Sequence, residues 1–189
     1  MLHAINIALV SWVLYCAIRV VIAPRNAIQV GANVLANTPN DFAFQTYMKV
    51  REFYLQLSPG HKKYELRGTE LLKDVVIDVW EEAGFQFVKH QYRVSELIPP
   101  ERMKLVSESS QVKVLGLFRG QTRSEVVFRF TPTADSKTTL GLAICIVFSS
   151  KLRQFLARLF FTEAIWQAHA KQEMKALARL IEQRYAKAA

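Results

Sequence analysis

The strongest hydrophobic pattern lies near the start of the chain, where residues 5–23 contain only three polar positions, Asn6, Ser11 and Arg19. A helix of that length extends about 28 Å at about 1.5 Å per residue, close to the thickness of a bilayer's hydrocarbon core. Arg19 lies about one turn from the end of the run, where its aliphatic stem can reach the membrane interface. The pattern predicts a single membrane anchor, with a cleaved signal peptide or a surface-lying helix as alternatives.

After this run the apolar positions predict one strand, one helix, six more strands and a long final helix. Residues 28–37 have strand character, and apolar residues recur at helical spacing over residues 42–57. The six strand-like runs are residues 64–70, 75–82, 85–97, 103–114, 124–131 and 138–148. Residues 151–187 contain no Gly or Pro and predict an amphipathic helix, whose apolar first half can form a separate short helix.

The links between the six runs are short and carry turn residues, so successive strands must pair antiparallel. Alternation places Val75, Ile77 and Val79 on one apolar face of their predicted strand. It places Phe128 and Phe130 on one apolar face of a later strand. The last run is apolar on both faces. We expect its outer face to be covered by a membrane, a homodimer partner, a partner in a membrane complex or another part of the chain.

Composition and charge narrow the class of protein. The chain has 189 residues, 51% of them apolar, and a formal charge of +9. These values exclude a disordered chain and suit one domain with a short appendage. The two cysteines, Cys16 and Cys145, indicate no disulfide framework. No basic stripe with interleaved aromatic residues is present, so we expect no nucleic-acid partner.

The charges around the N-terminal run predict its orientation. Arg19 and Arg25 lie at its C-terminal side, and no Lys or Arg precedes it. By the positive-inside rule, the remainder of the chain then lies in the cytoplasm, where anionic lipid would attract its basic surface. We expect a membrane localisation with a single N-terminal span and a cytoplasmic domain.

The order of one strand, a helix, six strands and a long C-terminal helix resembles the START-like superfamily, also called SRPBCC, which includes polyketide cyclases and lipid carriers. The resemblance implies an α+β helix-grip fold, in which a curved antiparallel sheet of about seven strands wraps the C-terminal helix. It divides the chain into an anchor, residues 1–24, and a START-like domain, residues 25–189. It also implies a cavity for a hydrophobic small molecule, and the expected lining residues are Val79, Phe128, Phe130 and Trp166.

Three segments carry the residue types of a metal site. His169 and Glu173 are four residues apart, which places them on one face of the final helix. His61 follows the Pro59-Gly60 turn, in a predicted loop. Glu81 and Glu82 end a predicted strand, where parity turns Glu81 inward unless a bulge reverses the two. Imidazole and carboxylate together suit zinc or another first-row divalent ion, although exposed ion pairs have the same spacing.

This set resembles the metal site of the diacetylphloroglucinol hydrolases, a START-like branch that uses zinc to cleave a carbon–carbon bond between an acyl group and a phenolic ring. The resemblance implies that His61, Glu81 or Glu82, His169 and Glu173 bind the metal. The present chain departs from that family because it is shorter and begins with an anchor-like helix. The reaction is therefore less well supported than the metal site.

A hydrolase of this kind also needs a proton donor, and Tyr64, His90 and Tyr92 are the candidate catalytic residues. If the chain is an enzyme, the pattern favours a metal-dependent hydrolase acting on an acyl-phenol or an ester. Two alternatives remain open. The domain can be a metal-free carrier of a lipid, quinone or isoprenoid, or it can be an accessory subunit of a membrane complex.

Overall fold

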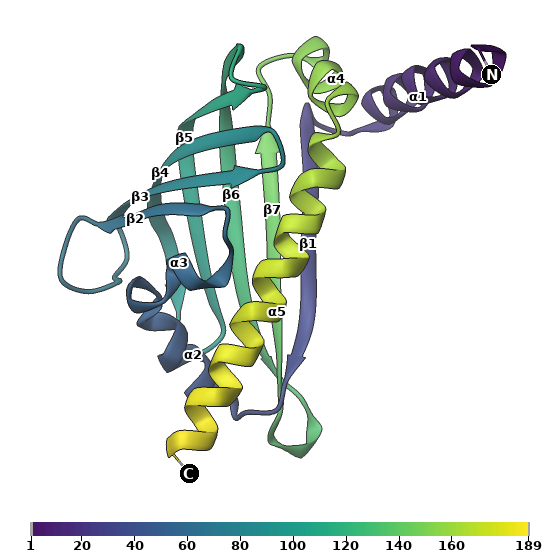
Figure 1. Cartoon of the computed structure of the whole chain (residues 1–189). Coiled ribbons are helices and arrows are strands. Elements are labelled where there is room, and N and C mark those ends of the chain that lie inside the picture. Colours follow the sequence, from purple (N-terminus) through teal and green to yellow (C-terminus); the bar gives the residue numbers. More distant parts are fainter. Residues whose placement is uncertain (1, 189) are drawn as a thin grey trace.

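The structure is a computed structural model that describes residues 2–188, with side chains described from residue 4 onward. A helix, α1 (Leu2–Ile22), projects from one end of a sheet-and-helix domain (Figure 1). The strands are β1 (Ala27–Ala36), β2 (His61–Leu66), β3 (Val76–Ala83), β4 (Gln86–Ile98), β5 (Arg102–Val114), β6 (Phe118–Pro132) and β7 (Thr138–Val147). The other helices are α2 (Asn40–Met48), η1 (Val50–Glu52), α3 (Tyr54–Leu57), η2 (Ala134–Ser136), α4 (Lys151–Leu159) and α5 (Thr162–Ala188).

The seven strands form one antiparallel sheet in the order β1-β7-β6-β5-β4-β3-β2. The sheet curves around α5, and α2 and α3 close the side next to β2 (Figure 1). This arrangement confirms the predicted α+β helix-grip fold with its long C-terminal helix. The first and last strands in sequence, β1 and β7, lie side by side at one edge of the sheet, and β2 forms the other edge.

The largest differences from the predicted elements occur where the apolar pattern is weak. The helical segment 42–57 is divided into α2, η1 and α3. Strand β6 begins at Phe118 rather than at residue 124, because backbone pairing with β5 extends it through polar, mostly exposed residues. The final helix is interrupted after Leu159, where Phe161 has a positive φ of 54°. That break makes α4 the separate short helix that the sequence allows.

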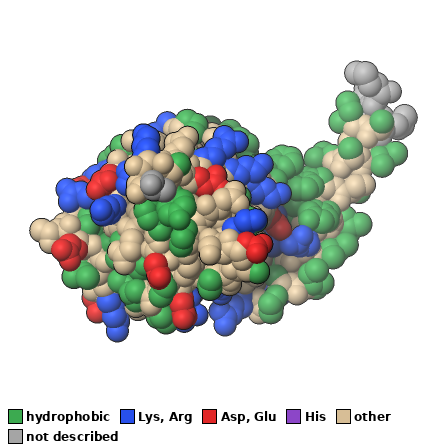
Figure 2. All heavy atoms as spheres, turned by 90° about the horizontal axis from the view of Figure 1, so that it is seen from below, with side chains coloured by type: hydrophobic (Ala, Val, Ile, Leu, Met, Phe, Trp, Pro, Cys, Tyr) green, Lys and Arg blue, Asp and Glu red, His purple; other side chains and the backbone are tan. Residues whose placement is uncertain are grey.

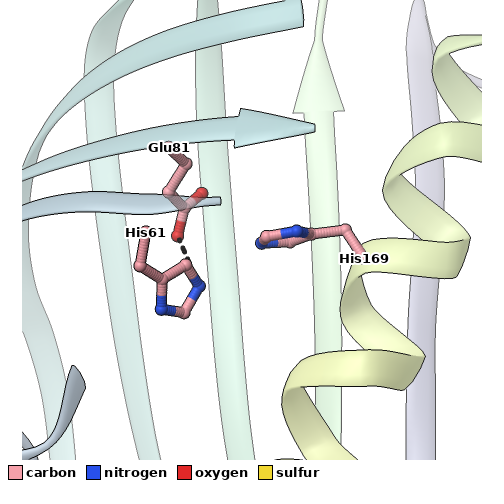
Figure 3. Close-up of side chains that lie close together, drawn as sticks. All are labelled: His61, Glu81 and His169. Atoms are coloured by element: carbon pink, nitrogen blue, oxygen red, sulfur yellow. Dashed lines mark ion pairs between the residues drawn. The ribbon is translucent and has the colours of Figure 1, made fainter. Parts of the chain in front are cut away.

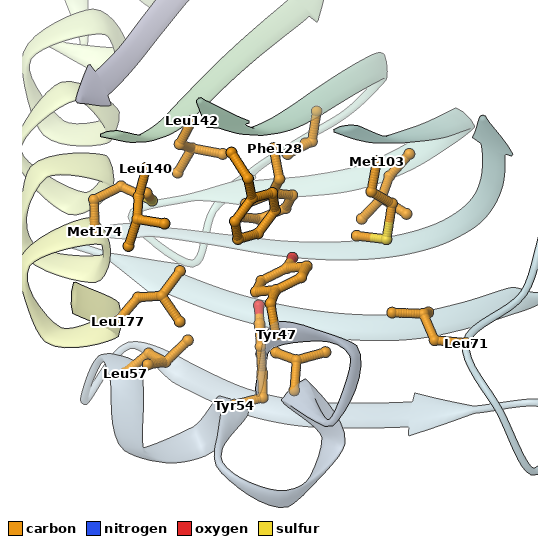
Figure 4. Packing of buried hydrophobic residues seen from close by; sticks show 14 of the residues in the cluster. Tyr47, Tyr54, Leu57, Leu71, Met103, Phe128, Leu140, Leu142, Met174 and Leu177 are labelled. Carbon is orange, nitrogen blue, oxygen red and sulfur yellow. The ribbon is translucent and has the colours of Figure 1, made fainter. Parts of the chain in front are cut away.

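Helix α5 contributes one side of the core through a stripe of residues at three- and four-residue steps. Met174, Leu177 and Ile181 on this stripe are buried, and they pack opposite Leu140 and Phe128 of the sheet (Figure 4). Two polar residues, His169 and Glu173, lie on the same buried stripe. The fold thus places an imidazole and a carboxyl group of α5 inside the domain.

Helix α1 is long and apolar enough to cross a bilayer, over Ala4–Ile22. Most of its side chains are exposed, and its apolar surface projects from a body whose charged side chains are dispersed (Figure 2). Signal sequences share this length and composition. A core helix would be mostly buried, which α1 is not. One narrow face, with Cys16 and Val20, is nevertheless buried where α1 packs on α4.

Gly60 provides a test of how the site-bearing strands are held together. A Cβ atom at this position would lie 2.0 Å from the carbonyl oxygen of Glu82 and 3.3 Å from His169 Cε1. We expect Gly60→Ala to lower the free energy of unfolding by about 1–3 kcal/mol, because β2 must move away from β3. Gly120→Ala is the matched control, since a Cβ there meets no atom within 4 Å. Equal stability of both variants in urea unfolding would contradict this account.

Candidate metal site

His61, Glu81 and His169 converge from β2, β3 and α5 (Figure 3). His61 and Glu81 are direct cross-strand partners in the β2–β3 ladder, which places their side chains on the same face of the sheet. One potential ligand atom from each of the three residues lies within 4.8 Å of the other two. The distance from His61 Nε2 to Glu81 Oε1 is 3.7 Å. Residues far apart in sequence therefore direct three donor groups to one point.

The tautomer of His61 is set by a backbone hydrogen bond. Its Nδ1–H donates to the carbonyl oxygen of Tyr54 at 2.8 Å, and the ring stacks on the Tyr54 ring with centroids 4.0 Å apart. This bond leaves the lone pair of Nε2 free. A histidine that ligates a metal is commonly oriented by just such a bond from its other nitrogen. His61 is thus held in the form that can bind a cation.

His169 and Glu173 lie one turn apart on α5 and approach the cluster from the helix side. Glu173 Oε2 is 3.9 Å from His61 Nε2, and the His169 ring lies 5.2 Å from the His61 ring. The Nε2 atoms of His61 and His169 are buried and have no hydrogen-bond partner among the described residues. Buried polar atoms are normally paired, and an unpaired one costs roughly 1–3 kcal/mol. The two nitrogens are therefore available to a ligand.

Two of the expected placements need correction. His61 is the first residue of β2 rather than a loop residue, because the ladder with β3 begins directly after Gly60. Glu82 does not join the cluster. Strand alternation turns it outward, where its half-exposed carboxylate pairs with Lys62 at 3.3 Å. Glu81 is the inward residue of the two.

The two carboxyl groups of the site have opposite shifts in pKa. Burial alone would raise the pKa of Glu81, but attraction from His90, His61 and His169 and a hydrogen bond from the Tyr54 hydroxyl hold it below its usual value. Burial, together with repulsion from Glu81, raises the pKa of Glu173 to about 8. At neutral pH Glu81 is therefore ionised and Glu173 retains its proton.

His90 extends the cluster along β4. Its Nε2 lies 3.8 Å from Glu81 Oε2, and its Nδ1 is 2.7 Å from the hydroxyl of Ser110. Ser110 in turn bonds to Ser107 and Ser124, and all three hydroxyl groups are buried. Burial lowers the pKa of His90 to about 4, against an opposing effect of Glu81. His90 is consequently neutral at physiological pH.

A cavity lies between the sheet and α5, next to the cluster. It contains about 900 Å³ of atom-free space, its open mouth included. Its wall combines apolar side chains with the carboxyl groups of Glu81 and Glu173 and with the three candidate proton donors, Tyr64, His90 and Tyr92. His169 instead borders a shallow surface groove beside Gly60 and Gln172. The cluster thus lies between the cavity and the protein surface.

Three of the four residues expected to line the cavity lie at its wall. Val79, Phe128 and Trp166 border the cavity. Phe130 does not, because it packs against Phe44 and Tyr47 deeper in the core. The Trp166 indole N–H donates to Gln86 at 2.9 Å, which fixes its ring at the cavity wall.

The nitrogen and oxygen donors of the cluster are of the kind that binds a divalent cation such as zinc. Tetrahedral ligands at about 2.0–2.2 Å from a zinc ion lie roughly 3.3–3.6 Å from one another. The His61 Nε2 distances of 3.7 Å to Glu81 and 3.9 Å to Glu173 are only slightly longer. A cation here would engage the two unpaired imidazole nitrogens and the Glu81 carboxylate, with Glu173 as a further ligand after losing its proton.

Sequence reasoning missed the groups that support the cluster. Tyr54 was not a candidate, although its carbonyl orients His61 and its hydroxyl donates to Glu81. The hydroxyl groups near His90 were also missed. Serine at an inward strand position is the one signal that could have indicated them, and a β-bulge between Ser107 and Ser110 obscures the parity.

The curved sheet wrapped around α5, with a cavity between them, is a helix-grip fold. No protein-family model matches the chain, and no curated protein matches its sequence. Solved structures with the same fold include protein TTHA0849 from Thermus thermophilus, with a TM-score of 0.63 and 15% identity over 81% of this chain and 96% of that chain. The Zhui aromatase/cyclase from a Streptomyces species has a TM-score of 0.60 and 16% identity over 84% of this chain and 96% of that chain.

A conserved protein from Geobacillus kaustophilus is similar to the same degree, with a TM-score of 0.57 and 17% identity over 83% of this chain and 95% of that chain. At these identities the likeness establishes the fold alone. It covers nearly the full length of each of the three structures. The chemistry of the present chain must therefore be argued from its own side chains.

The raised pKa of Glu173 generates a test in the metal-free protein. Between about pH 4.5 and 8 the unfolded chain releases a proton that folded Glu173 keeps, so this group lowers stability as pH rises through that range. Glu173→Gln removes the effect. In a chelating buffer we expect the variant to gain stability over the wild type by up to about 1.4 kcal/mol per pH unit, levelling off above pH 8.

Urea unfolding at several pH values measures this difference. Glu70→Gln, at an exposed position, controls for the loss of a carboxyl group as such. A Glu173→Gln variant that is less stable than the wild type throughout the range would show that Glu173 is not a strained, protonated carboxyl.

Proposed function

We propose that this protein is a membrane-associated START-like domain that binds a hydrophobic small molecule and holds a divalent cation, with His61, Glu81, His169 and Glu173 as ligands. The observation that carries the proposal is the pair of buried, unpaired imidazole nitrogens directed at one carboxylate. Unpaired polar atoms are costly in an apolar interior, and a bound ligand would remove that cost. The cation belongs to zinc or another first-row divalent metal, as the nitrogen and oxygen donors require.

The cavity supports a hydrophobic ligand whose polar group meets the cluster. Most of the wall is apolar, while Glu81, Glu173, His90 and Tyr92 lie on one part of it. Binding pockets for small molecules typically combine an apolar wall with a few convergent polar groups. An aromatic ring or an acyl chain fits the apolar part, and a carbonyl or phenolic oxygen fits the polar part.

The reaction that suits this arrangement is hydrolysis of an acyl-phenol or an ester. A bound cation polarises a carbonyl and lowers the pKa of a water molecule. In acyl-phenol cleavage, the bond between the acyl carbon and the ring breaks, the hydroxyl of water joins the acyl carbon, and a proton is delivered to the ring carbon. The products are a carboxylic acid and the deacylated phenol.

The proton delivered to the ring needs a donor that faces the cavity. Burial raises the pKa of Tyr92 well above its usual value, and Glu81 and Glu173 both add to this effect. Tyr92 thus keeps its proton at neutral pH and lies close to both carboxyl groups. For Tyr64, the neighbouring charge that affects the pKa is that of Arg51, which lowers it. We assign the donor role to Tyr92, which stacks on the neutral ring of His90 with centroids 4.6 Å apart.

A metal-free carrier of a lipid, quinone or isoprenoid is the second candidate. The observation that favours it is the mostly apolar lining of the cavity, which includes Ile77, Met103 and Phe148. Such a carrier needs the cavity and the apolar α1 but has no role for the unpaired histidines. Metal content therefore separates the two functions.

Metal analysis of the purified chain is the first test of the proposal. We expect about one zinc or other divalent ion per chain, lost in His169→Ala and in the double variant His61→Ala/His169→Ala. Glu81→Gln should weaken binding at least tenfold, and Glu82→Gln should not, because only Glu81 faces the cluster. Unchanged metal content in the His169 variant, with circular dichroism showing an intact fold, would refute the site.

Turnover by the metal-loaded chain is a separate test of the assigned chemistry. On a panel of acyl-phenols and aryl esters we expect carboxylic acid release that disappears on chelation. Tyr92→Phe should lower kcat on acyl-phenols by about 10²-fold or more without changing metal content, as for a lost general acid. Tyr64→Phe is the matched control on the same cavity wall. Full activity of the Tyr92 variant would remove Tyr92 from the donor role.

A further inference from the structure

Helix α4 has its polar and apolar faces reversed relative to a helix on a water-exposed surface. Gln154 and Arg158, one turn apart, are 0% and 5% exposed, whereas Leu152 and Leu156 are 65% and 44% exposed. Each inward side chain makes one hydrogen bond: Gln154 Nε2 donates to the carbonyl oxygen of Ala27 at 2.7 Å, and Arg158 Nη1 donates to Glu163. The fold therefore fixes this orientation, and it directs the leucines outward.

The β3–β4 and β5–β6 turns add exposed apolar side chains at the end of the domain where α4 lies. The amide of Leu115, in the β5–β6 turn, donates to the carbonyl oxygen of Phe85 in the β3–β4 turn at 2.9 Å. The ring of Phe118 lies 5.5 Å from that of Phe160, directly after α4. We call the exposed residues of this surface the apolar end: Phe85, Leu115, Leu117, Phe118, Leu152 and Leu156. It lies at the top of the domain in Figure 1, where α1 leaves.

Packing couples α1 to this surface. The Trp12 ring stacks on Phe161 at 4.7 Å and its N–H donates to the carbonyl oxygen of Leu159, while Arg19 pairs with Glu163 at 2.7 Å. Trp12 precedes Ile22 by ten residues, so about 15 Å of α1 lies beside the domain. A bilayer crossing needs about 20 residues. Helix α1 can therefore enter a bilayer over its full apolar length only if α4 reaches the membrane with it.

The charge of this end suits an anionic lipid surface. Residues 109–123 and 148–162 contain no Asp or Glu. They contribute the exposed basic residues Lys113, Arg119, Lys151 and Arg153 next to the apolar end. Near an anionic leaflet each such charge adds to the attraction. Exposed apolar side chains ringed by Lys and Arg are typical of surfaces that enter the boundary between headgroups and acyl chains.

We propose that the apolar end inserts into the headgroup–acyl boundary of an anionic bilayer and holds the cavity against the membrane. The cavity lining reaches this end through Val112, Phe148 and Ala157. A hydrophobic ligand would then pass between bilayer and cavity without crossing water. This inference rests on the proposed membrane association of α1. It adds a second membrane contact, which the domain itself makes.

Spin-label accessibility in the full chain tests the insertion. The chain, with Cys16 and Cys145 replaced by alanine, is labelled singly at Leu117→Cys, Leu156→Cys, Val10→Cys or Leu72→Cys, all exposed positions. It is reconstituted into vesicles of phosphatidylcholine and phosphatidylglycerol. Collisions with oxygen and with a water-soluble nickel chelate are then compared. We expect labels at 10, 117 and 156 to favour oxygen several-fold over the label at 72, which remains in water.

The outcomes separate this inference from the anchoring on which it rests. A membrane-embedded label at 10 with water-exposed labels at 117 and 156 overturns the insertion and leaves the anchor. Water-exposed labels at all positions overturn both. Labels at 117 and 156 shielded from both reagents indicate a protein partner or a second copy, and they also overturn the insertion.

A pair of double variants that introduce negative charge completes the test. Leu152→Glu/Leu156→Glu should abolish the oxygen preference of the label at 117, while the matched control Leu35→Glu/Leu72→Glu, at similarly exposed leucines, should retain it. Retention of the preference in the α4 double variant would show that α4 does not contact the bilayer.

Discussion

Two buried imidazole nitrogens without a protein partner are the constraint on which the interior of this protein depends. The Nε2 atoms of His61 and His169 lie near the ionised Glu81 inside the domain, and among the described residues neither has a hydrogen-bond partner. Leaving such groups unpaired is costly, and replacing them with apolar residues would be the simpler way to build a core. The surrounding bonds instead preserve them: the Tyr54 carbonyl fixes the tautomer of His61, and the Tyr54 hydroxyl supports the charge of Glu81. Binding of a cation by the cluster would account for all of these contacts.

The helix-grip fold provides the geometry that this cluster needs. The β2–β3 ladder aligns His61 with Glu81, and α5 delivers His169 and Glu173 on the stripe that also packs the core through Met174 and Leu177. Because α5 is held along its whole length by the curved sheet, the helix-borne groups cannot move independently of the strand-borne ones. The cavity lies beside the cluster, and Glu81, Glu173 and His90 form part of its wall. At its other end the cavity approaches α4 and α1, the most apolar part of the surface.

Much of the architecture could be predicted from the sequence, because alternation in strands and helical spacing report directly which positions face the core. Parity selected Glu81, and four-residue spacing placed His169 and Glu173 on one face of α5, whereas His61 was expected in a loop and lies instead at the start of β2. Sequence reasoning could not identify Tyr54 or Ser110, whose roles depend on contacts between elements and, for Ser110, on a β-bulge. It could not orient α4 either. Periodicity shows that a helix has two faces, but tertiary packing decided that Gln154 and Arg158 face inward.

X-ray absorption spectroscopy of the zinc-loaded chain tests the central claim most directly, because it reports the atoms bound to the metal rather than the presence of metal alone. The account predicts only nitrogen and oxygen neighbours, at about 2.0–2.2 Å, with the outer-shell scattering of two imidazole rings. In His169→Gln the contribution of one ring should be lost. A spectrum with a sulfur neighbour, or with oxygen neighbours and no imidazole, would place the metal elsewhere and contradict the account.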